Sequence, residues 1–547
     1  MEQPLTISEA LSAMDSGALT SVELTGMVVD RADRYDDGLG VFVSRFAESA
    51  IRAAEQADRM RRDGQHRPLL GIPIAVKDII TTADGPTTGQ SAVLDREWGA
   101  GDAAVVARLR DAGAVIVGKT TTMEFAFGSP DPAKQFPIPR NPWDPRRWPG
   151  GSSSGSASGC AAGMFLGAVG TDTGASVRMP SALSGTTGIK PTYGRVPKSG
   201  CVPLGYTLDC IGPMARSAHD CGVLLAAMAG AHHCDPTTDR RDVPHYPDAL
   251  DGDLTGYTIG VDTLQRFSGD TDPALAPLFA DTIAALEAAG ATVVDLALPY
   301  YPEVTAAAVI TILAEASAYH APDIKSRWAD YFGFTRLGLG LAAFASGADY
   351  VQAQRVRQVG QRAVAQLFEN VDLILTPTVS RPAPLVEASG DYTATLFAGE
   401  AFSYHTAYWN ALGNPALSMP IGFNSGGLPL AAQLIGRPFD ESLVLRAADA
   451  YQRRTRWHLA EPPLRDGVDN RAWEDAEPPE QPSDQTETFV EETLRRSGYD
   501  VPPQELPGLA ASLPLVRHNS DIIYSLAETR YAEPATVFRA TEVPAAH

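Results

Sequence analysis

Two glycine- and serine-rich loops hold the side chains best suited to do chemistry in this sequence. The first loop, 149–155, contains Ser152, and the second, 171–176, ends at Ser176. Backbone N–H groups in such turns can converge on one point, where they would stabilise the oxyanion formed by attack on a carbonyl. Ser176 would make that attack. The alternative is a pair of flexible linkers, which fits less well because predicted ordered elements flank both loops.

A serine nucleophile requires a base that takes its proton. No histidine lies near these loops in the sequence, although a distant one could fold in, whereas Lys77 follows the apolar segment 69–76. Burial at the end of a strand disfavours a charged ammonium group and lowers the pKa of lysine. Lys77 is therefore a candidate base, although most lysines in proteins are solvated and have no such role.

Residues 113–120 match the P-loop pattern GxxxxGK[ST]. A phosphate-binding loop needs a glycine-rich turn between its two glycines, after a strand and before a helix. The four intervening residues here, Ala-Val-Ile-Val, are typical of a strand. We therefore interpret the segment as a turn at Gly113 followed by a strand that ends at Gly118.

Residues 151–155 match the GxSxG nucleophile pattern, with Ser153 at its centre. That pattern requires an apolar strand just before it. The preceding residues, 141–150, contain three prolines, and proline cannot donate to the hydrogen bonds of a central strand. Ser153 is therefore not predicted to be the nucleophile.

Residues 232–235, His-His-Cys-Asp, are of types that bind metal ions. No second cluster of such residues is evident in the sequence, and the segment falls in a predicted loop. We interpret it as a polar surface loop, and we predict no metal site and no cofactor.

Alternating strands and helices are predicted to position the two reactive loops. Helical spacing of apolar residues predicts helices over 7–14, 22–28, 103–112 and from Pro273 to Gly290, and small residues predict a helix over 156–164. Buried strands are predicted at 69–76, 114–117, 165–169, 257–261, 292–296, 371–376 and 416–421. This alternation indicates an α/β fold with a mixed or largely parallel sheet.

The 547-residue chain has the composition of an ordinary globular protein, and its length suggests roughly three or four domains or one large domain with appendages. Lys+Arg 44 and Asp+Glu 66 give a net charge of −22, which disfavours direct binding of nucleic acid. Five irregularly spaced cysteines without a Cys-x-x-Cys motif are expected to be reduced thiols in a cytoplasm. We see no signal peptide and no apolar run long enough to span a membrane.

The composition changes near residue 461. Residues 461–487 are rich in acidic residues and proline, which predicts a solvated linker. Residues 488–547 regain apolar side chains and predict two short helices and an extended tail. About 60 residues seldom bury a stable core alone, so this segment is expected to pack on the main body, 1–460, or on a partner.

Several long motifs resemble the amidase signature family. They occur in the family's order over about residues 5–460, so the body is expected to be an amidase signature catalytic domain. The resemblance implies a large mixed β-sheet surrounded by helices, with a small C-terminal helical appendage, and it implies hydrolysis of carbon–nitrogen bonds. The motifs lie at 73–78, 118–125, 149–155, 170–178, 188–195, 208–213, 414–420 and 433–436.

The resemblance also implies a Ser–Ser–Lys triad. Ser176 corresponds to the nucleophile, Ser152 to the bridging serine and Lys77 to the base. The bridging serine of this family follows an unusual cis peptide bond, so a cis Gly151–Ser152 bond is expected. The implied oxyanion hole consists of Thr173, Gly174, Ala175 and Ser176.

Ala175 departs from the family, in which glycine is usual before the nucleophile. Its methyl group could crowd the oxyanion turn or the acyl pocket, but it removes no N–H group, so we expect activity with an altered substrate shape. The candidate substrate-binding residues are Ala126, Phe127 and Tyr206, which would form a partly apolar pocket.

The C-terminal segment has a second, weaker resemblance, carried by 489–496, the proline pair at 502–503, a leucine-spaced helix and 533–539. It is similar to the small partner subunit of carboxybiuret hydrolase, which is itself similar to the C subunit of the tRNA amidotransferase. In those systems the partner is a separate chain that wraps and stabilises the amidase subunit. Fusion through the acidic linker would let the segment dock without an assembly step.

The leading hypothesis is a stand-alone cytoplasmic amidohydrolase that forms an acyl-enzyme on a small-molecule amide. The first alternative is a glutamine-hydrolysing subunit of a tRNA-dependent amidotransferase, in which another subunit would hold the tRNA. The second is a non-catalytic scaffold, which the presence of Lys77, Ser152 and Ser176 disfavours. Aryl amides, carbamates and urea-like amides such as carboxybiuret all remain open as substrates. No membrane and no direct nucleic-acid partner is expected, and a homodimer is left open.

Overall fold

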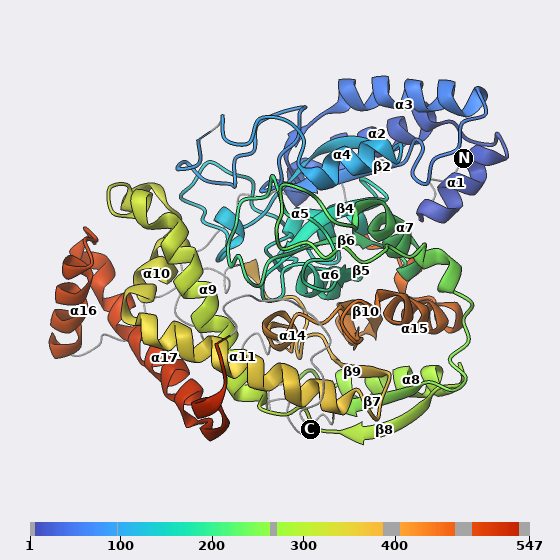
Figure 1. Cartoon of the computed structure of the whole chain (residues 1–547). Helices are drawn as coiled ribbons and strands as arrows, with labels where there is room; N and C mark the ends of the chain where they lie inside the picture. Colours follow the sequence, from blue (N-terminus) through green and yellow to red (C-terminus); the bar gives the residue numbers. More distant parts are fainter. Residues whose placement is uncertain (1–5, 96, 263–270, 387–404, 465–483, 535–547) are drawn as a thin grey trace.

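A computed structural model describes the chain except for residues 1–5, 96, 263–270, 387–404, 465–483 and 535–547 (Figure 1). Its centre is one eleven-stranded sheet. The strands are β1 (Phe42–Arg45), β2 (Pro73–Lys77), β3 (Val115–Thr120), β4 (Gly167–Asp172), β5 (Thr187–Lys190), β6 (Cys210–Ala215), β7 (Thr258–Asp262), β8 (Thr292–Leu296), β9 (Leu373–Pro377), β10 (Ala416–Phe423) and β11 (Pro429–Ile435). Their order across the sheet is β1-β3-β2-β4-β6-β5-β10-β11-β9-β7-β8.

The sheet is mixed. β2 runs parallel to β3 and β4, and β7 runs parallel to β8 and β9. The strands between these two groups pair in antiparallel fashion, with β10 between β5 and β11. The predicted α/β fold with a large mixed sheet is therefore confirmed.

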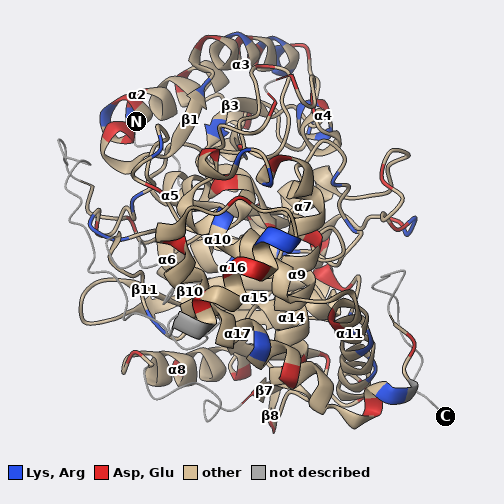
Figure 2. Ribbon diagram, turned by 90° about the vertical axis from the view of Figure 1, so that its left-hand side faces the viewer, with Lys and Arg blue, Asp and Glu red and all other residues tan. Residues whose placement is uncertain are grey.

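Helices cover both faces of the sheet (Figure 1). The main helices are α1 (Ile7–Asp15), α2 (Ser21–Leu39), α3 (Ala47–Arg62), α4 (Ala104–Asp111), α5 (Ser154–Ala161), α6 (Arg178–Ser184), α7 (Ala218–Met228), α8 (Leu275–Glu287), α9 (Tyr301–Ile324), α10 (Gly333–Leu341), α11 (Gly347–Leu367), α14 (Ala407–Leu412), α15 (Glu441–Arg454), α16 (Asp484–Arg496) and α17 (Leu506–Ser525). Figure 2 shows charged residues of both signs spread along outer helices such as α3 and α11.

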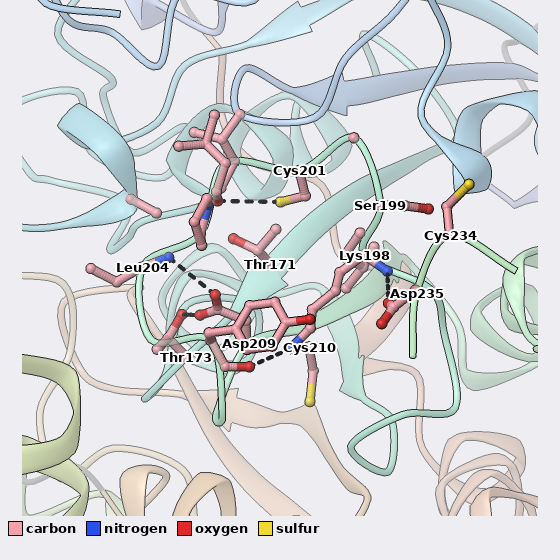
Figure 3. A pocket seen from close by; sticks show the side chains of 17 residues that line it. Thr171, Thr173, Lys198, Ser199, Cys201, Leu204, Asp209, Cys210, Cys234 and Asp235 are labelled. Atoms are coloured by element: carbon pink, nitrogen blue, oxygen red, sulfur yellow. Dashed lines mark hydrogen bonds between the residues drawn. The ribbon is translucent and has the colours of Figure 1, made fainter. Parts of the chain in front are cut away.

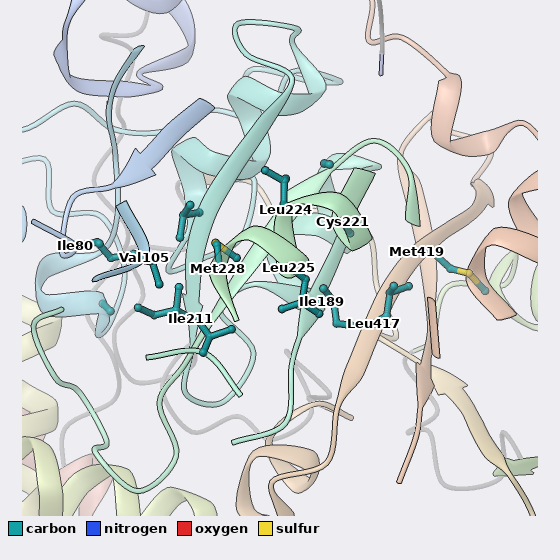
Figure 4. Close-up of a cluster of buried hydrophobic side chains, with 14 of the residues drawn as sticks. Ile80, Val105, Ile189, Ile211, Cys221, Leu224, Leu225, Met228, Leu417 and Met419 are labelled. Atoms are coloured by element: carbon teal, nitrogen blue, oxygen red, sulfur yellow. The ribbon is translucent and has the colours of Figure 1, made fainter. Parts of the chain in front are cut away.

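Alternate side chains of a strand point to opposite faces, which divides the core into two main clusters. Leu417 of β10 belongs to the first cluster, together with Leu225 of α7 and Ile189 of β5 (Figure 4). Ala416, one residue earlier, belongs to the second cluster, which α9, α11 and α14 cover. The sheet is therefore buried on both sides, which keeps loops at its strand ends in fixed positions.

The predicted elements are found with shifted boundaries. The predicted strand at 69–76 is observed only from Pro73, because Gly71 adopts a φ of +84° and the Ile72 N–H donates to Leu69 O in a turn. The predicted strand at 165–169 becomes β4 and extends to Asp172. The predicted helix at 156–164 is α5, which begins at Ser154.

Helix α9 is apolar and long enough, by length and composition alone, to cross a membrane. Half of the apolar stretch is nevertheless buried inside the fold, where α9 packs against α11, α14 and α17. The helix is thus accounted for as a core helix, and it is the one described helix that meets this criterion.

The C-terminal segment packs on the main body. Helix α17 contacts α9, α10 and α11, and it buries Leu509, Leu513 and Val516 (Figure 1). It has 20 residues and is longer than the short helix predicted. Helix α16 begins inside the predicted linker, most of which lies outside the described residues.

Candidate active site

Lys77 is the last residue of β2 and is fully buried. Its Nζ lies 2.8 Å from Ser152 Oγ and 2.8 Å from Thr171 Oγ1. Burial lowers the pKa of Lys77 from its ordinary value to about 7. A lysine that is neutral near pH 7 has a free lone pair, so Lys77 can accept a proton from Ser152.

Ser152 lies in the loop before α5, and the Gly151–Ser152 peptide bond is cis, as the family resemblance implied. The adjacent Ser153 has a structural role, because its Oγ donates to Thr171 O and accepts from Thr171 N–H. Ser153 is fully buried and follows no strand. The GxSxG pattern is therefore not a nucleophile elbow.

Ser176 ends the turn that follows β4. The Ser153 N–H donates to Ser176 O at 3.1 Å, which holds the turn against the Ser152 loop. Among the described residues, no hydrogen bond joins Ser152 Oγ to Ser176 Oγ. Catalytic hydrogen bonds are often long in an enzyme without substrate and shorten in the complex.

The turn folds around the buried carboxylate of Asp172. Asp172 Oδ2 accepts hydrogen bonds from the N–H groups of Val177 and Arg178, at 3.2 and 3.3 Å. The Arg178 guanidinium donates to both carboxylate oxygens, at 2.9 and 3.0 Å. Burial alone would raise the pKa of Asp172, but Arg178 lowers it to about 2. Asp172 is therefore a charged anchor for the turn.

Arg178 is itself fully buried and bound by residues distant in sequence. It donates to Asn410 Oδ1 and to Gln433 Oε1. The Asn410 amide in turn donates to Asp172 Oδ1 at 2.9 Å. This network connects the turn that bears Ser176 to α14 and β11.

The backbone of the turn offers unpaired donors. Among the described residues, no acceptor pairs with the N–H groups of the four predicted oxyanion-hole residues, Thr173, Gly174, Ala175 and Ser176. The Ala175 side chain packs in an apolar cluster with Met123 and Trp148. The methyl group is thus accommodated, and the four donors remain available for an oxyanion.

A cavity of about 210 Å³ adjoins the triad (Figure 3). Thr171, which is bound to Lys77, lines it, as do Ala126 and Tyr206 from the predicted substrate-binding set. Phe127 is not among the residues that line this cavity. Its ring packs against Phe334 of α10 at a centroid distance of 6.1 Å, so it supports the wall from behind.

Asp209 connects this cavity to the oxyanion turn. It accepts a hydrogen bond from Thr173 Oγ1 at 2.6 Å and from the N–H groups of Leu204 and Gly205, both at 3.0 Å (Figure 3). Cys201 also lines the cavity, but burial raises the pKa of its thiol to about 12. The thiol stays protonated, which disfavours Cys201 as a competing nucleophile.

The P-loop pattern at 113–120 is strand β3, as interpreted from the sequence. Lys119 is buried and forms an ion pair with Asp78 at 3.1 Å, and its Nζ also donates to Thr87 Oγ1. Lys119 therefore has a structural role in the described fold.

The segment 232–235 forms a turn at the rim of the cavity, which Cys234 and Asp235 line. Potential ligand atoms of His232, His233 and Cys234 lie within 4.8 Å of one another. However, His232 Nδ1 accepts the Cys234 N–H and contacts Ser199 Oγ, and Asp235 Oδ2 accepts the Lys198 N–H. These bonds account for the segment as a polar loop.

Comparison with known proteins gives the family. The sequence model of a family described as Amidase matches residues 23–445. The chain belongs to the amidase family. One relative is the amidase-family component of the glutamyl-tRNA(Gln) amidotransferase of Roseiflexus sp., which is 40% identical over 483 residues, or 84% of this chain and 98% of the relative.

Solved structures of the amidase family agree with the fold. The peptide amidase from Stenotrophomonas maltophilia is 28% identical, with a TM-score of 0.70 over 83% of this chain and 98% of its own. A structure described as a vestigial protein complex that reveals the evolutionary origins of an s-triazine catabolic enzyme is 28% identical. Its TM-score is 0.76 over 82% of this chain and 98% of its own. The amidase signature resemblance of the motifs is therefore confirmed.

Sequence reasoning missed three groups of this site. Asp172 and Arg178 lie within a quoted motif, and their opposite charges six residues apart were a usable signal. Thr171, which bonds Lys77, lies in the same motif. The role of Asn410 leaves no signal in a single sequence, because its partner Asp172 is 238 residues away.

Proposed function

We propose that this amidase-family protein is an amidohydrolase that cleaves the carbon–nitrogen bond of a small amide through Ser176, Ser152 and Lys77. The observation that carries the proposal is the buried Lys77 Nζ, 2.8 Å from Ser152 Oγ, beside a turn whose N–H groups lack acceptors in the described chain. A base, a bridging hydroxyl, a nucleophile and an oxyanion hole together suffice for acyl transfer.

The proposed reaction begins with attack of Ser176 Oγ on the amide carbonyl. The Ser176 proton passes to Ser152 Oγ as the Ser152 proton passes to neutral Lys77. The N–H groups of the 173–176 turn stabilise the oxyanion. When the carbon–nitrogen bond breaks, the proton returns from Lys77 through Ser152 to the departing nitrogen. Water then attacks the acyl-enzyme by the same proton route and regenerates Ser176.

A second candidate is glutamine hydrolysis within a tRNA-dependent amidotransferase complex. Its support is the name of the relatives, which are 36 to 40% identical to this chain. We favour the stand-alone enzyme because helices α16 and α17 of the same chain already occupy α9, α10 and α11. This arrangement suits the proposal that the tail is a fused counterpart of a separate partner subunit, and it points to urea-like amides as substrates.

Two measurements on the full chain test the proposal. A fluorophosphonate probe should modify Ser176 covalently, as peptide mapping by mass spectrometry would show. A panel of aryl amides, carbamates, biuret derivatives and glutamine should then identify the substrate class without any added protein. Ser16→Ala, an exposed serine at the end of α1, is the matched control and should label like the wild type.

Two results would contradict the proposal. Labelling elsewhere than Ser176, or none, would remove the nucleophile assignment. Turnover of glutamine alone, and only after addition of a partner complex, would favour the amidotransferase alternative.

A further inference from the structure

One wall of the active-site cavity is an irregular turn at 124–127, which includes the short helix η1 (Glu124–Ala126). Phe125 and Ala126 have φ angles of +50° and +62°, in the left-handed region that side chains other than glycine rarely adopt. Such a conformation persists only where the surroundings hold it. Since Ala126 lines the cavity, whatever holds this turn also shapes the space open to substrate.

Helix α10 and the residues just before it hold this turn. The Phe332 N–H donates to Glu124 Oε2 at 2.6 Å, and Thr335 Oγ1 donates to Phe127 O at 3.2 Å. A Cβ added at Gly338 would lie 2.5 Å from the Phe127 ring, so this ring packs directly on the helix backbone. A movement of α10 would therefore be transmitted to the turn.

The C-terminal tail grips the same segment through Glu505. This residue ends the short helix η7 (Pro503–Glu505), just before α17. Glu505 Oε1 and Oε2 accept from the Arg336 guanidinium, both at 2.9 Å, and Oε2 also accepts from Trp328 Nε1 at 3.0 Å. Both charged side chains are largely shielded, with exposures of 20% for Arg336 and 25% for Glu505.

The geometry of this grip favours a positioning role. A two-point bond between arginine and carboxylate fixes the relative orientation of its partners as well as their distance. Leu509, fully buried, packs 3.2 Å from the position of a Cβ at Gly340, one turn beyond Arg336 on α10. Polar and apolar contacts thus fix the helix at two places.

We propose that Glu505 is a positioning residue for substrate selection: through Arg336 it holds α10, and α10 holds the turn that places Ala126 in the cavity wall. The proposal rests on the amidase function proposed above, because it concerns the same cavity. The tail then contributes no reacting group, yet it determines which amides fit. A merely structural brace would instead lower stability and leave the preference among substrates unchanged.

Glu505→Gln tests this, since it keeps the shape of the side chain but removes its charge and one acceptor. The ratio of kcat/KM for a bulky and a compact amide should change by about tenfold, as expected for a small reshaping of a pocket. The rate at which a small fluorophosphonate labels Ser176 should stay within about twofold of wild type, because the triad is unchanged. Arg336→Lys, which keeps the charge but loses the two-point bond, should shift the ratio in the same direction.

Glu528→Gln is the matched control. Glu528 also lies in the tail and accepts from Tyr300 OH at 3.4 Å, but no hydrogen bond or ion pair of the described residues joins it to α10. This variant should leave the substrate ratio unchanged. An unchanged ratio in both Glu505→Gln and Arg336→Lys, even with a lower melting temperature, would overturn the positioning role. Failure of wild-type Ser176 to label would instead refute the proposed function, so the two failures are distinguishable.

Discussion

Thr171 and Ala126 line the same cavity but are held in place by different means. Thr171 lies in β4, between β2 and β6, and bonds Lys77 of the neighbouring strand. Ala126 lies in a turn with a positive φ, which α10 and, through Arg336, the tail hold from outside the sheet. We call the first region the catalytic floor (Lys77, Ser152 and 171–178) and the second the cavity wall (124–127, 328–341 and Glu505).

The difference indicates how chemistry and selection can be separated. The groups of the catalytic floor sit at strand ends and in short loops, where buried hydrogen bonds fix them. The cavity wall depends on contacts between segments up to 177 residues apart in sequence within 328–341 and the tail. Changes in the wall should therefore alter substrate preference, whereas changes in the floor should stop the reaction or destabilise the fold.

The largest effect is expected from Ser176→Ala on the catalytic floor. Loss of a covalent nucleophile typically lowers the rate on the order of 10³- to 10⁶-fold. The melting temperature should be unchanged, because no hydrogen bond in the described structure uses Ser176 Oγ. Steady-state kinetics and thermal unfolding measure the two quantities. A variant with near-normal kcat would show that the nucleophile lies elsewhere.

Lys77→Met should abolish most activity, because it removes the proton acceptor and keeps an apolar chain of similar length. In the wild type, burial lowers the pKa of Lys77 to about 7, so the base is neutral above this pH and protonated below it. We therefore expect kcat/KM to fall as the pH decreases through about 7. A pH–rate profile that stays flat from acid to alkaline pH would argue against a lysine base.

Asp172→Asn should destabilise the floor by about 3–5 kcal/mol, because it leaves the buried Arg178 without its anionic partner. Since Arg178 lowers the pKa of Asp172 to about 2, the stabilisation by this pair is complete above the ordinary pKa near 4. It is lost as the pH falls towards 2. Urea unfolding at pH 7 and pH 3 measures both effects, and a variant as stable as wild type would contradict the anchor role.

Truncation after residue 465 should affect stability more than chemistry. It removes Leu509, Leu513 and Val516, each worth roughly 1.5–3 kcal/mol of burial before ordering costs. The exposed face of α9 and α10 should lower the melting temperature and favour aggregation, while Ser176 still reacts with a fluorophosphonate. Size-exclusion chromatography and labelling follow the two effects. A truncated enzyme that melts and selects like the full chain would make the tail dispensable.

The smallest effect is expected from removal of metal ions. In the proposed reaction Lys77 is the proton acceptor and backbone N–H groups stabilise the oxyanion, so a zinc chelator should leave kcat/KM unchanged. Assays with and without the chelator test this. A marked loss would direct attention to the 232–234 cluster at the cavity rim.

The floor was more predictable from the sequence than the wall. Apolar strands end at Lys77 and precede the 171–176 turn, so local patterns and family motifs both indicate these positions. Phe127 was expected in the pocket, but its ring turns towards α10, because Gly338 leaves room for it there. That contact spans more than two hundred residues, and a single sequence holds no signal of which distant glycine faces which ring.

The position of β10 within the sheet has a consequence for how the chain is made. It covers the edge of β5, and Arg178 needs Asn410 and Gln433 as partners, 232 and 255 residues further along. A nascent chain that emerges from the ribosome therefore carries an unpaired strand edge and an incomplete nucleophile turn until most of it has been synthesised. Assembly of the catalytic floor is thus a late step of biosynthesis, and fragments that end before β10 should be inactive and prone to aggregate.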